Sequence, residues 1–98
     1  EDIILPGGRT VPWNQLKSIA NHPSTRQFQI VQNEDGSITF RYEAEKDVHT
    51  DRLENLLLYR CHKLLGFAVI IEIKKVEKIG HAAGGKSKLV ISHYRPVG

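Results

Sequence analysis

The sequence predicts an α+β fold in which two helices pack on one face of a mainly antiparallel sheet. Two segments repeat apolar residues every three or four positions, as amphipathic helices do, and three longer segments alternate apolar and polar residues, as half-buried strands do. In chain order they read helix, strand, strand, helix, strand. If the second arm of an N-terminal hairpin supplies a strand before them, this is the split βαβ core of a ferredoxin-like domain, with a further strand at the C-terminus. The 98 residues suffice for one hydrophobic core.

The first elements are a short hairpin and a short helix. Residues 3–5 and 9–11 form the hairpin arms, and the Pro6-Gly7-Gly8 turn supplies one preset φ and two positions that tolerate positive φ. The helix follows from Pro12, which suits a first helical turn, to about residue 20. Its apolar residues are Trp13, Leu16, Ile19 and Ala20. Trp13 is expected to pack against the core or, if exposed, to mark an interface with a further domain.

A longer hairpin comes next. Residues 26–32 and 38–44 place apolar residues at alternate positions, and an Asn-Glu-Asp-Gly turn at 33–36 connects them. The residues expected on the core side are Phe28, Ile30, Ile38, Phe40, Tyr42 and Ala44. This pattern predicts two antiparallel strands with one face on the core.

The second helix has the strongest pattern in the chain. Asp51 is predicted to cap its N-terminus, with Glu54 reaching back from the third position, and Gly66 ends it. Its wide apolar stripe consists of Leu53, Leu56, Leu57, Cys61, Leu64 and Leu65. Cys61 is the only cysteine, so no disulfide can form within the chain. Its place in the stripe predicts a buried thiol rather than a nucleophile.

Two strands complete the fold. Residues 67–76 are predicted to form a central strand, because Ala68 and Ile70 make its first half apolar on both faces. The residues expected on its buried face are Phe67, Val69, Ile71 and Ile73. Residues 89–91, Leu-Val-Ile, are rich in β-branched side chains, which predicts a last strand there. Core positions under every interpretation are Phe28, Phe40, Leu57 and Ile71.

Composition narrows the function classes. The chain contains no methionine, so we expect it to be a piece of a longer polypeptide. No signal peptide is recognisable, and the longest apolar run, residues 67–71, is far shorter than the ~20 residues that span a bilayer, which predicts a cytoplasmic location and no membrane partner. The net charge of +3 suits phosphate-bearing ligands but also an ordinary surface. The five histidines lack the spacing of a helical metal pair, so no metal site is predicted.

The glycine-rich segment 80–88 holds the main candidate for chemistry. Gly80 to Ser87 matches the phosphate-loop pattern G-x-x-x-x-G-K-S, but such a loop needs a helix that begins at its lysine, and residues 88–92 have a strand pattern. The match is therefore interpreted as accidental. Gly84 and Gly85 would still let backbone amides approach a phosphate, and Lys86 would place one compact charge there. The alternative is that Lys86 is a solvated cation beside a surface turn.

Short motifs occur in a fixed order: EDII at 1–4, GGRTV at 7–11, FQIVQ at 28–32, and GK at 85–86 followed by LVIS at 89–92. Together they resemble the C-terminal domain of adenylate-forming enzymes of the phenylacetate-CoA ligase type, including relatives in capsular polysaccharide synthesis. The resemblance covers essentially the whole chain. It departs at residues 78–81, where the family often has a proline, and at Lys88, where it usually has an arginine.

The resemblance implies that residues 1–98 are the mobile C-terminal lobe of a larger ATP-dependent acid–CoA ligase. In that family a large N-terminal domain binds ATP, Mg and a carboxylic acid, and the lobe rotates before coenzyme A attacks. By resemblance, Lys86 is the lysine that assists adenylation and Asp2 is the hinge. The turn residues Gly7, Gly8 and Arg9 would face the reaction site in the thioester-forming state. The lobe alone is expected to bind no cofactor.

Other function classes remain open at this stage. A free-standing ferredoxin-like nucleic-acid binder would suit the basic charge, but it needs base-stacking aromatics on an open sheet face. Since Phe28, Phe40 and Tyr42 belong to the expected core, nucleic acid is not the expected partner. A small-molecule regulatory or assembly module would dimerise through a strand edge.

Overall fold

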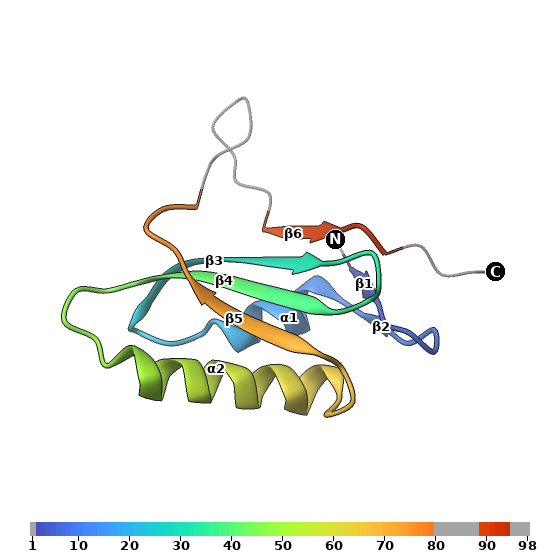
Figure 1. Cartoon of the computed structure of the whole chain (residues 1–98), viewed down its shortest axis with the longest axis horizontal. Coiled ribbons are helices and arrows are strands. Elements are labelled where there is room, and N and C mark those ends of the chain that lie inside the picture. Colours follow the sequence, from blue (N-terminus) through green and yellow to red (C-terminus); the bar gives the residue numbers. More distant parts are fainter. Residues whose placement is uncertain (1, 80–88, 95–98) are drawn as a thin grey trace.

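A computed structural model describes residues 2–79 and 89–94 of the chain. Their elements, in chain order, are β1 (Ile3–Ile4), β2 (Thr10–Val11), α1 (Trp13–Ile19), β3 (Thr25–Gln32), β4 (Ile38–Ala44), α2 (Thr50–Leu65), β5 (Ile71–Lys75) and β6 (Val90–Ser92). Figure 1 shows both helices on the same side of the sheet that contains β3 and β4. The α+β class is therefore confirmed. Neither helix in this part of the chain is long and apolar enough to cross a membrane.

The larger sheet has the strand order β5-β4-β3-β6, and β1 and β2 form a separate pair. The predicted hairpin of β3 and β4 is antiparallel, whereas β4 pairs with β5, and β3 with β6, in parallel. This differs from the split βαβ arrangement, in which the second hairpin arm would join the main sheet. The arm does not do so, because β2 is only two residues long before Pro12 and α1, and because β4 pairs directly with β5, where the arm would have to lie.

The segment after α2 corrects a second expectation. The predicted central strand over residues 67–76 is only Ile71–Lys75 long, and it lies at the edge of the sheet. Residues 67–70 instead turn the chain from the end of α2 back toward the sheet, beginning at Gly66 with φ of 110°. Phe67 and Ile70 are 73% and 74% exposed, so the apolar run that suggested a buried strand is largely a surface loop.

The N-terminus of α2 also differs in detail from the prediction. The helix begins at Thr50, so Asp51 lies inside the first turn, and the capping position is held by His49, whose side chain makes no capping hydrogen bond. Glu54 does not reach back to the cap. Its Oε2 accepts a hydrogen bond of 2.6 Å from the hydroxyl of Tyr42, which joins α2 to β4. Burial and the Glu54 hydrogen bond raise the pKa of this buried tyrosine.

One core joins the helices, the larger sheet and the β1–β2 hairpin. Its fully buried members include Ile3, Val11, Leu16, Ile30, Phe40, Leu57 and Cys61. Phe28, Ile71 and Trp13 are partly buried against it. The predicted buried thiol is thus confirmed, and burial raises the pKa of Cys61 to about 12.

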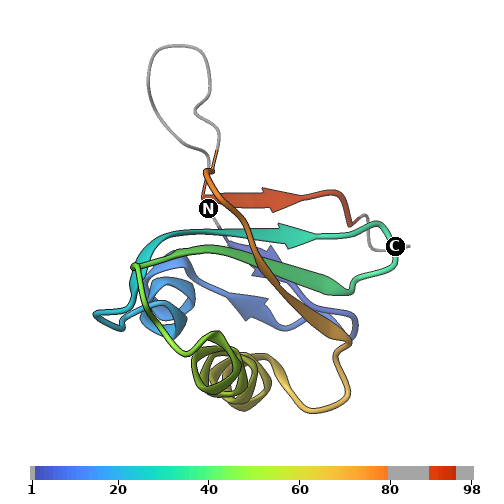
Figure 2. The same cartoon turned by 60° about the vertical axis from the view of Figure 1, so that its left-hand side comes forward.

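The hairpin of β1 and β2 lies on the helix side of the larger sheet (Figure 2). A buried amide holds it there: Gln32 Nε2 donates to the carbonyl oxygen of Ile4 at 2.8 Å, and Gln32 Oε1 accepts from the Ser92 hydroxyl at 2.8 Å. Both ends of the buried amide are therefore satisfied, as burial requires. The hairpin is fixed relative to β3 and β6.

Candidate functional site

The predicted site residues fall into two groups. Lys86, Gly84 and Gly85 lie outside the described residues. Asp2, Gly7, Gly8 and Arg9 lie in or next to the β1–β2 hairpin. The geometry of the candidate site is therefore the geometry of this hairpin and of the elements that surround it.

Asp2 contacts the beginning of α1. Its Oδ1 accepts a hydrogen bond of 3.3 Å from the backbone N–H of Trp13, the first residue of the helix. The first N–H groups of a helix have no partner within the helix, and Pro12 at the capping position supplies no side-chain acceptor. The predicted hinge residue thus connects the chain before β1 to the rigid body of the domain.

The hairpin turn is closed by two backbone hydrogen bonds. Leu5 N–H donates to Arg9 O at 2.8 Å, and Gly8 N–H donates to Leu5 O at 2.9 Å. Gly7 and Gly8 have φ of 102° and 94°, a region in which residues with a side chain are strained. A Cβ added at either position would meet no heavy atom of the described structure within 4 Å. The turn therefore presents bare backbone to open space.

Arg9 connects this turn to α2. Its Nη2 donates a hydrogen bond of 2.6 Å to the carbonyl oxygen of Leu64, one of the last carbonyls of α2. A cation at a helix C-terminus is stabilised by the unpaired carbonyls and by the helix dipole. The expectation that Arg9 faces the reaction site stays a prediction, and what the structure shows is that its side chain fixes the hairpin to the helix.

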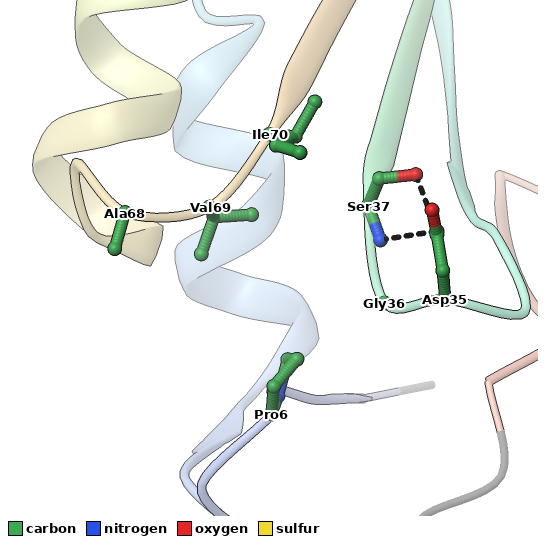
Figure 3. Close-up of a pocket in the computed structure, with 7 residues that line it drawn as sticks. All are labelled: Pro6, Asp35, Gly36, Ser37, Ala68, Val69 and Ile70. Carbon is green, nitrogen blue, oxygen red and sulfur yellow. Dashed lines mark hydrogen bonds between the residues drawn. The ribbon is translucent and has the colours of Figure 1, made fainter.

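A cavity of about 210 Å³ lies beside the turn (Figure 3). Three segments far apart in the sequence enclose it: Pro6 of the β1–β2 turn, residues 35–37 of the β3–β4 turn, and residues 68–70 after α2. Asp35 Oδ1 accepts hydrogen bonds from the backbone N–H and the hydroxyl of Ser37, at 3.0 and 2.7 Å, and these bonds lower the pKa of Asp35. Ser37 and one carboxylate oxygen of Asp35 are thus paired with each other, and most of the remaining lining is apolar.

Gly36 sets the distance between two of these segments, and its replacement by alanine is expected to destabilise the chain. The residue has φ of 90°, and an added Cβ would lie 2.6 Å from Cγ of Pro6, too close for any real contact. Backbone strain and displacement of the hairpin turn should together lower the free energy of unfolding by about 2–3 kcal/mol. Urea unfolding measures this loss.

The matched control is Gly7→Ala, which has the same sign of φ but no neighbour for the added methyl. Its expected loss is about 1–2 kcal/mol, from the backbone alone. Equal losses for the two variants would show that the Pro6 contact has no energetic role.

In the described ranges, no group of three or more His, Cys, Asp or Glu side chains could hold a metal ion. Turn residues at Pro6-Gly7-Gly8 and at 33–36 predict each turn separately, but no local pattern indicates that the two turns meet. The bonds from Arg9 to Leu64 and from Trp13 to Asp2 join residues 55 and 11 positions apart, so local patterns could not reveal them either.

Comparison with known proteins finds one matching family model and several solved structures of similar fold. A family model described as the CapK C-terminal domain matches residues 5–93. A crystal structure of an open conformation of 2-hydroxyisobutyryl-CoA ligase, in complex with 2-HIB-AMP and CoA, has a similar fold: the TM-score is 0.69 at 16% sequence identity. The similarity covers 93% of this chain and 21% of that ligase, so the chain spans about a fifth of the ligase's length. No curated protein matches in sequence.

Proposed function

Because the chain belongs to the CapK C-terminal domain family, we propose that it is the mobile C-terminal lobe of a larger adenylate-forming ligase. The family match over residues 5–93 carries this proposal. The fold similarity supports it, since the similar structure is that of a CoA ligase with an acyl-adenylate and CoA. The parent would use ATP with Mg, a carboxylic acid and coenzyme A, bound mainly by the N-terminal domain of the same polypeptide.

The proposed reaction has two steps. In the first, a carboxylate oxygen attacks the α-phosphorus of ATP, pyrophosphate leaves, and an acyl-adenylate forms. In the second, the thiol of coenzyme A attacks the acyl carbon, AMP leaves, and a thioester forms. Negative charge develops on the phosphoryl and carboxyl oxygens of the first step, where the ammonium of Lys86 would stabilise it.

The second step would use the other candidate surface of the lobe. Gly7, Gly8 and Arg9 would face the reaction site after the lobe has reoriented about Asp2. The open space around both glycines supports this role, because a bare turn can approach a substrate closely. The contact of Asp2 with Trp13 supports the hinge role, since it couples residue 2 to α1.

The nucleic-acid alternative is weakened by the positions of the aromatic rings. On the helix side, Trp13 stacks on Phe28 and Phe28 stacks on Phe40, with ring centroids 5.8 Å apart in both pairs. On the opposite face of β3 and β4 the pairs are Gln29 with Arg41 and Val31 with Thr39, so these strands offer bases no ring there. The backbone N–H of Ile79 also donates to Glu43 on that face, at 2.9 Å.

The proposal is tested with the full-length polypeptide. A panel of carboxylic acids is assayed for acid-dependent exchange of pyrophosphate into ATP, followed by CoA-dependent release of AMP. We expect exchange with at least one acid, and its loss in a control polypeptide that lacks the present 98 residues. Absence of exchange with every acid, together with salt-sensitive RNA binding by the isolated chain, would favour the nucleic-acid alternative instead.

A further inference from the structure

The loop between α2 and β5, residues 67–70, carries the two most exposed large hydrophobic side chains of the described residues. Phe67 and Ile70 are 73% and 74% exposed, and Ala68 between them is exposed as well. Isolated exposed apolar side chains are ordinary, but a cluster beside a cavity marks an interaction surface more often. We refer to Phe67, Ala68 and Ile70, together with the cavity beside Pro6, as the loop surface.

The loop surface is held in a defined shape. The Phe67 ring stacks on His62 with centroids 5.3 Å apart and planes 8° from parallel. His62 Nδ1 lies 3.2 Å from the carbonyl oxygen of Gly66, at hydrogen-bond distance. At the same end of α2, the Arg9 side chain donates a hydrogen bond to the carbonyl oxygen of Leu64. A surface fixed in this way loses little conformational entropy when a partner covers it.

The chemistry of the cavity selects an apolar occupant. Its apolar walls are Pro6, Ala68, Val69 and Ile70, and the Ser37 hydroxyl and backbone N–H both donate to one carboxylate oxygen of Asp35. The Ser37 hydroxyl also accepts a hydrogen bond from Asn33 Nδ2 at 3.0 Å. Asp35, the one charged residue of the lining, is exposed to solvent, so a polar group that entered would lose water and gain few partners other than that carboxylate. An apolar side chain would lose only unfavourable contact with water.

We propose that the loop surface docks on the N-terminal part of the same ligase polypeptide, which inserts an apolar side chain into the cavity when the lobe is in the thioester-forming state. This inference rests on the proposed function. The reason for this state is geometric, because Pro6 of the turn expected to face the reaction site is itself a wall of the cavity. A movement of the lobe that brings the turn to the reaction site therefore also brings the loop surface to the N-terminal part of the polypeptide.

The size of the loop surface favours a tethered partner over a second copy of the chain. Stable complexes between separate proteins bury about 1,200–2,000 Å², far more than two exposed large side chains and a small cavity provide. A partner in the same polypeptide acts at a high effective concentration, so a small contact suffices. The chain corresponds to 21% of the similar ligase, which leaves ample polypeptide for that partner. The contact must also be weak, because the lobe has to leave the thioester-forming state again after each reaction.

The test compares both half-reactions in the full-length ligase carrying Phe67→Ser and Ile70→Ser together. Both side chains are mostly exposed, so the substitutions should not disturb folding. We expect thioester formation from preformed acyl-adenylate to fall about tenfold, with ATP–pyrophosphate exchange within about twofold of the unmodified enzyme. The matched control is Tyr59→Ser, another large side chain, 54% exposed on α2 itself, which should leave both steps unchanged.

A second readout does not depend on activity. Ile70→Cys in the full-length ligase is labelled with an environment-sensitive fluorophore, and the buried Cys61 is not expected to react. Coenzyme A with a non-reactive acyl-adenylate analogue should shift the emission to shorter wavelength, because the label becomes covered. Another cysteine that reacts is identified by peptide mapping and replaced first.

The outcomes separate the two proposals. Unchanged thioester formation and emission would overturn the docking surface while leaving the ligase function in place. Equal loss of both half-reactions would also overturn it, since that indicates general damage to the lobe. A concentration-dependent dimer that disappears in the double variant would assign the loop surface to a second copy of the chain. Absence of exchange in the unmodified enzyme would refute the ligase function itself.

Discussion

Replacing Lys86 by alanine in the full-length ligase is expected to reduce acid-dependent ATP–pyrophosphate exchange by about 10²- to 10³-fold. Thioester formation from preformed acyl-adenylate should be largely retained. The reason is that, in the proposed mechanism, the ammonium would stabilise charge that develops only while the carboxylate attacks the α-phosphorus. In the proposed mechanism, the hairpin turn rather than Lys86 would lie at the reaction site during the second step.

Two further variants sharpen this experiment. Lys86→Arg should recover little activity, because a planar guanidinium does not place a compact charge where the ammonium would lie. Lys78→Ala removes an exposed cation just before the same segment and should leave both steps unchanged. If Lys86→Ala reduced both steps equally, or neither, the assignment of this lysine to adenylation would be wrong.

The sequence was sufficient for the elements whose signals are local. The β3–β4 hairpin, both helices and the short N-terminal hairpin lie where periodicity and turn residues placed them. The resemblance to the ligase family, read from motifs spread along the chain, is confirmed by the family match over residues 5–93. Periodicity reports which face of an element is buried, and these elements bury the face that was expected.

The features that could not be predicted from the sequence depend on contacts between distant segments. Apolar residues 67–70 fit a buried strand by pattern, and only the position of α2 relative to the sheet makes them a loop. The parallel pairing of β3 with β6 likewise joins residues about sixty positions apart. For the candidate site, the family resemblance pointed to Asp2 and Arg9, but no pattern in the sequence indicated their partners Trp13 and Leu64.

The stability of the lobe should depend most strongly on Phe40, and its replacement by alanine is expected to lower the free energy of unfolding by about 3–5 kcal/mol. Phe40 is fully buried, and its strand β4 pairs with β3 and β5 on either side. Its ring stacks on Phe28 with planes 7° apart. For a domain of this size the loss corresponds to a fall in melting temperature of more than about 12 °C, measurable by circular dichroism.

Phe28→Ala is the matched control, because it removes the same side chain one strand away from a partly buried position. We expect about half the loss, since less apolar surface leaves contact with the core. The double variant should lose less than the sum, by about 0.5–1.5 kcal/mol, because either single substitution already removes the stacked pair. A Phe28 variant as unstable as the Phe40 variant would show that the centre of the core lies nearer α1 than β4.

In the full-length ligase, loss of Phe40 should weaken both half-reactions together, since either role of the lobe requires the folded sheet. Loss of Lys86 should weaken one alone, so the pair of variants distinguishes failure of the fold from failure of the site.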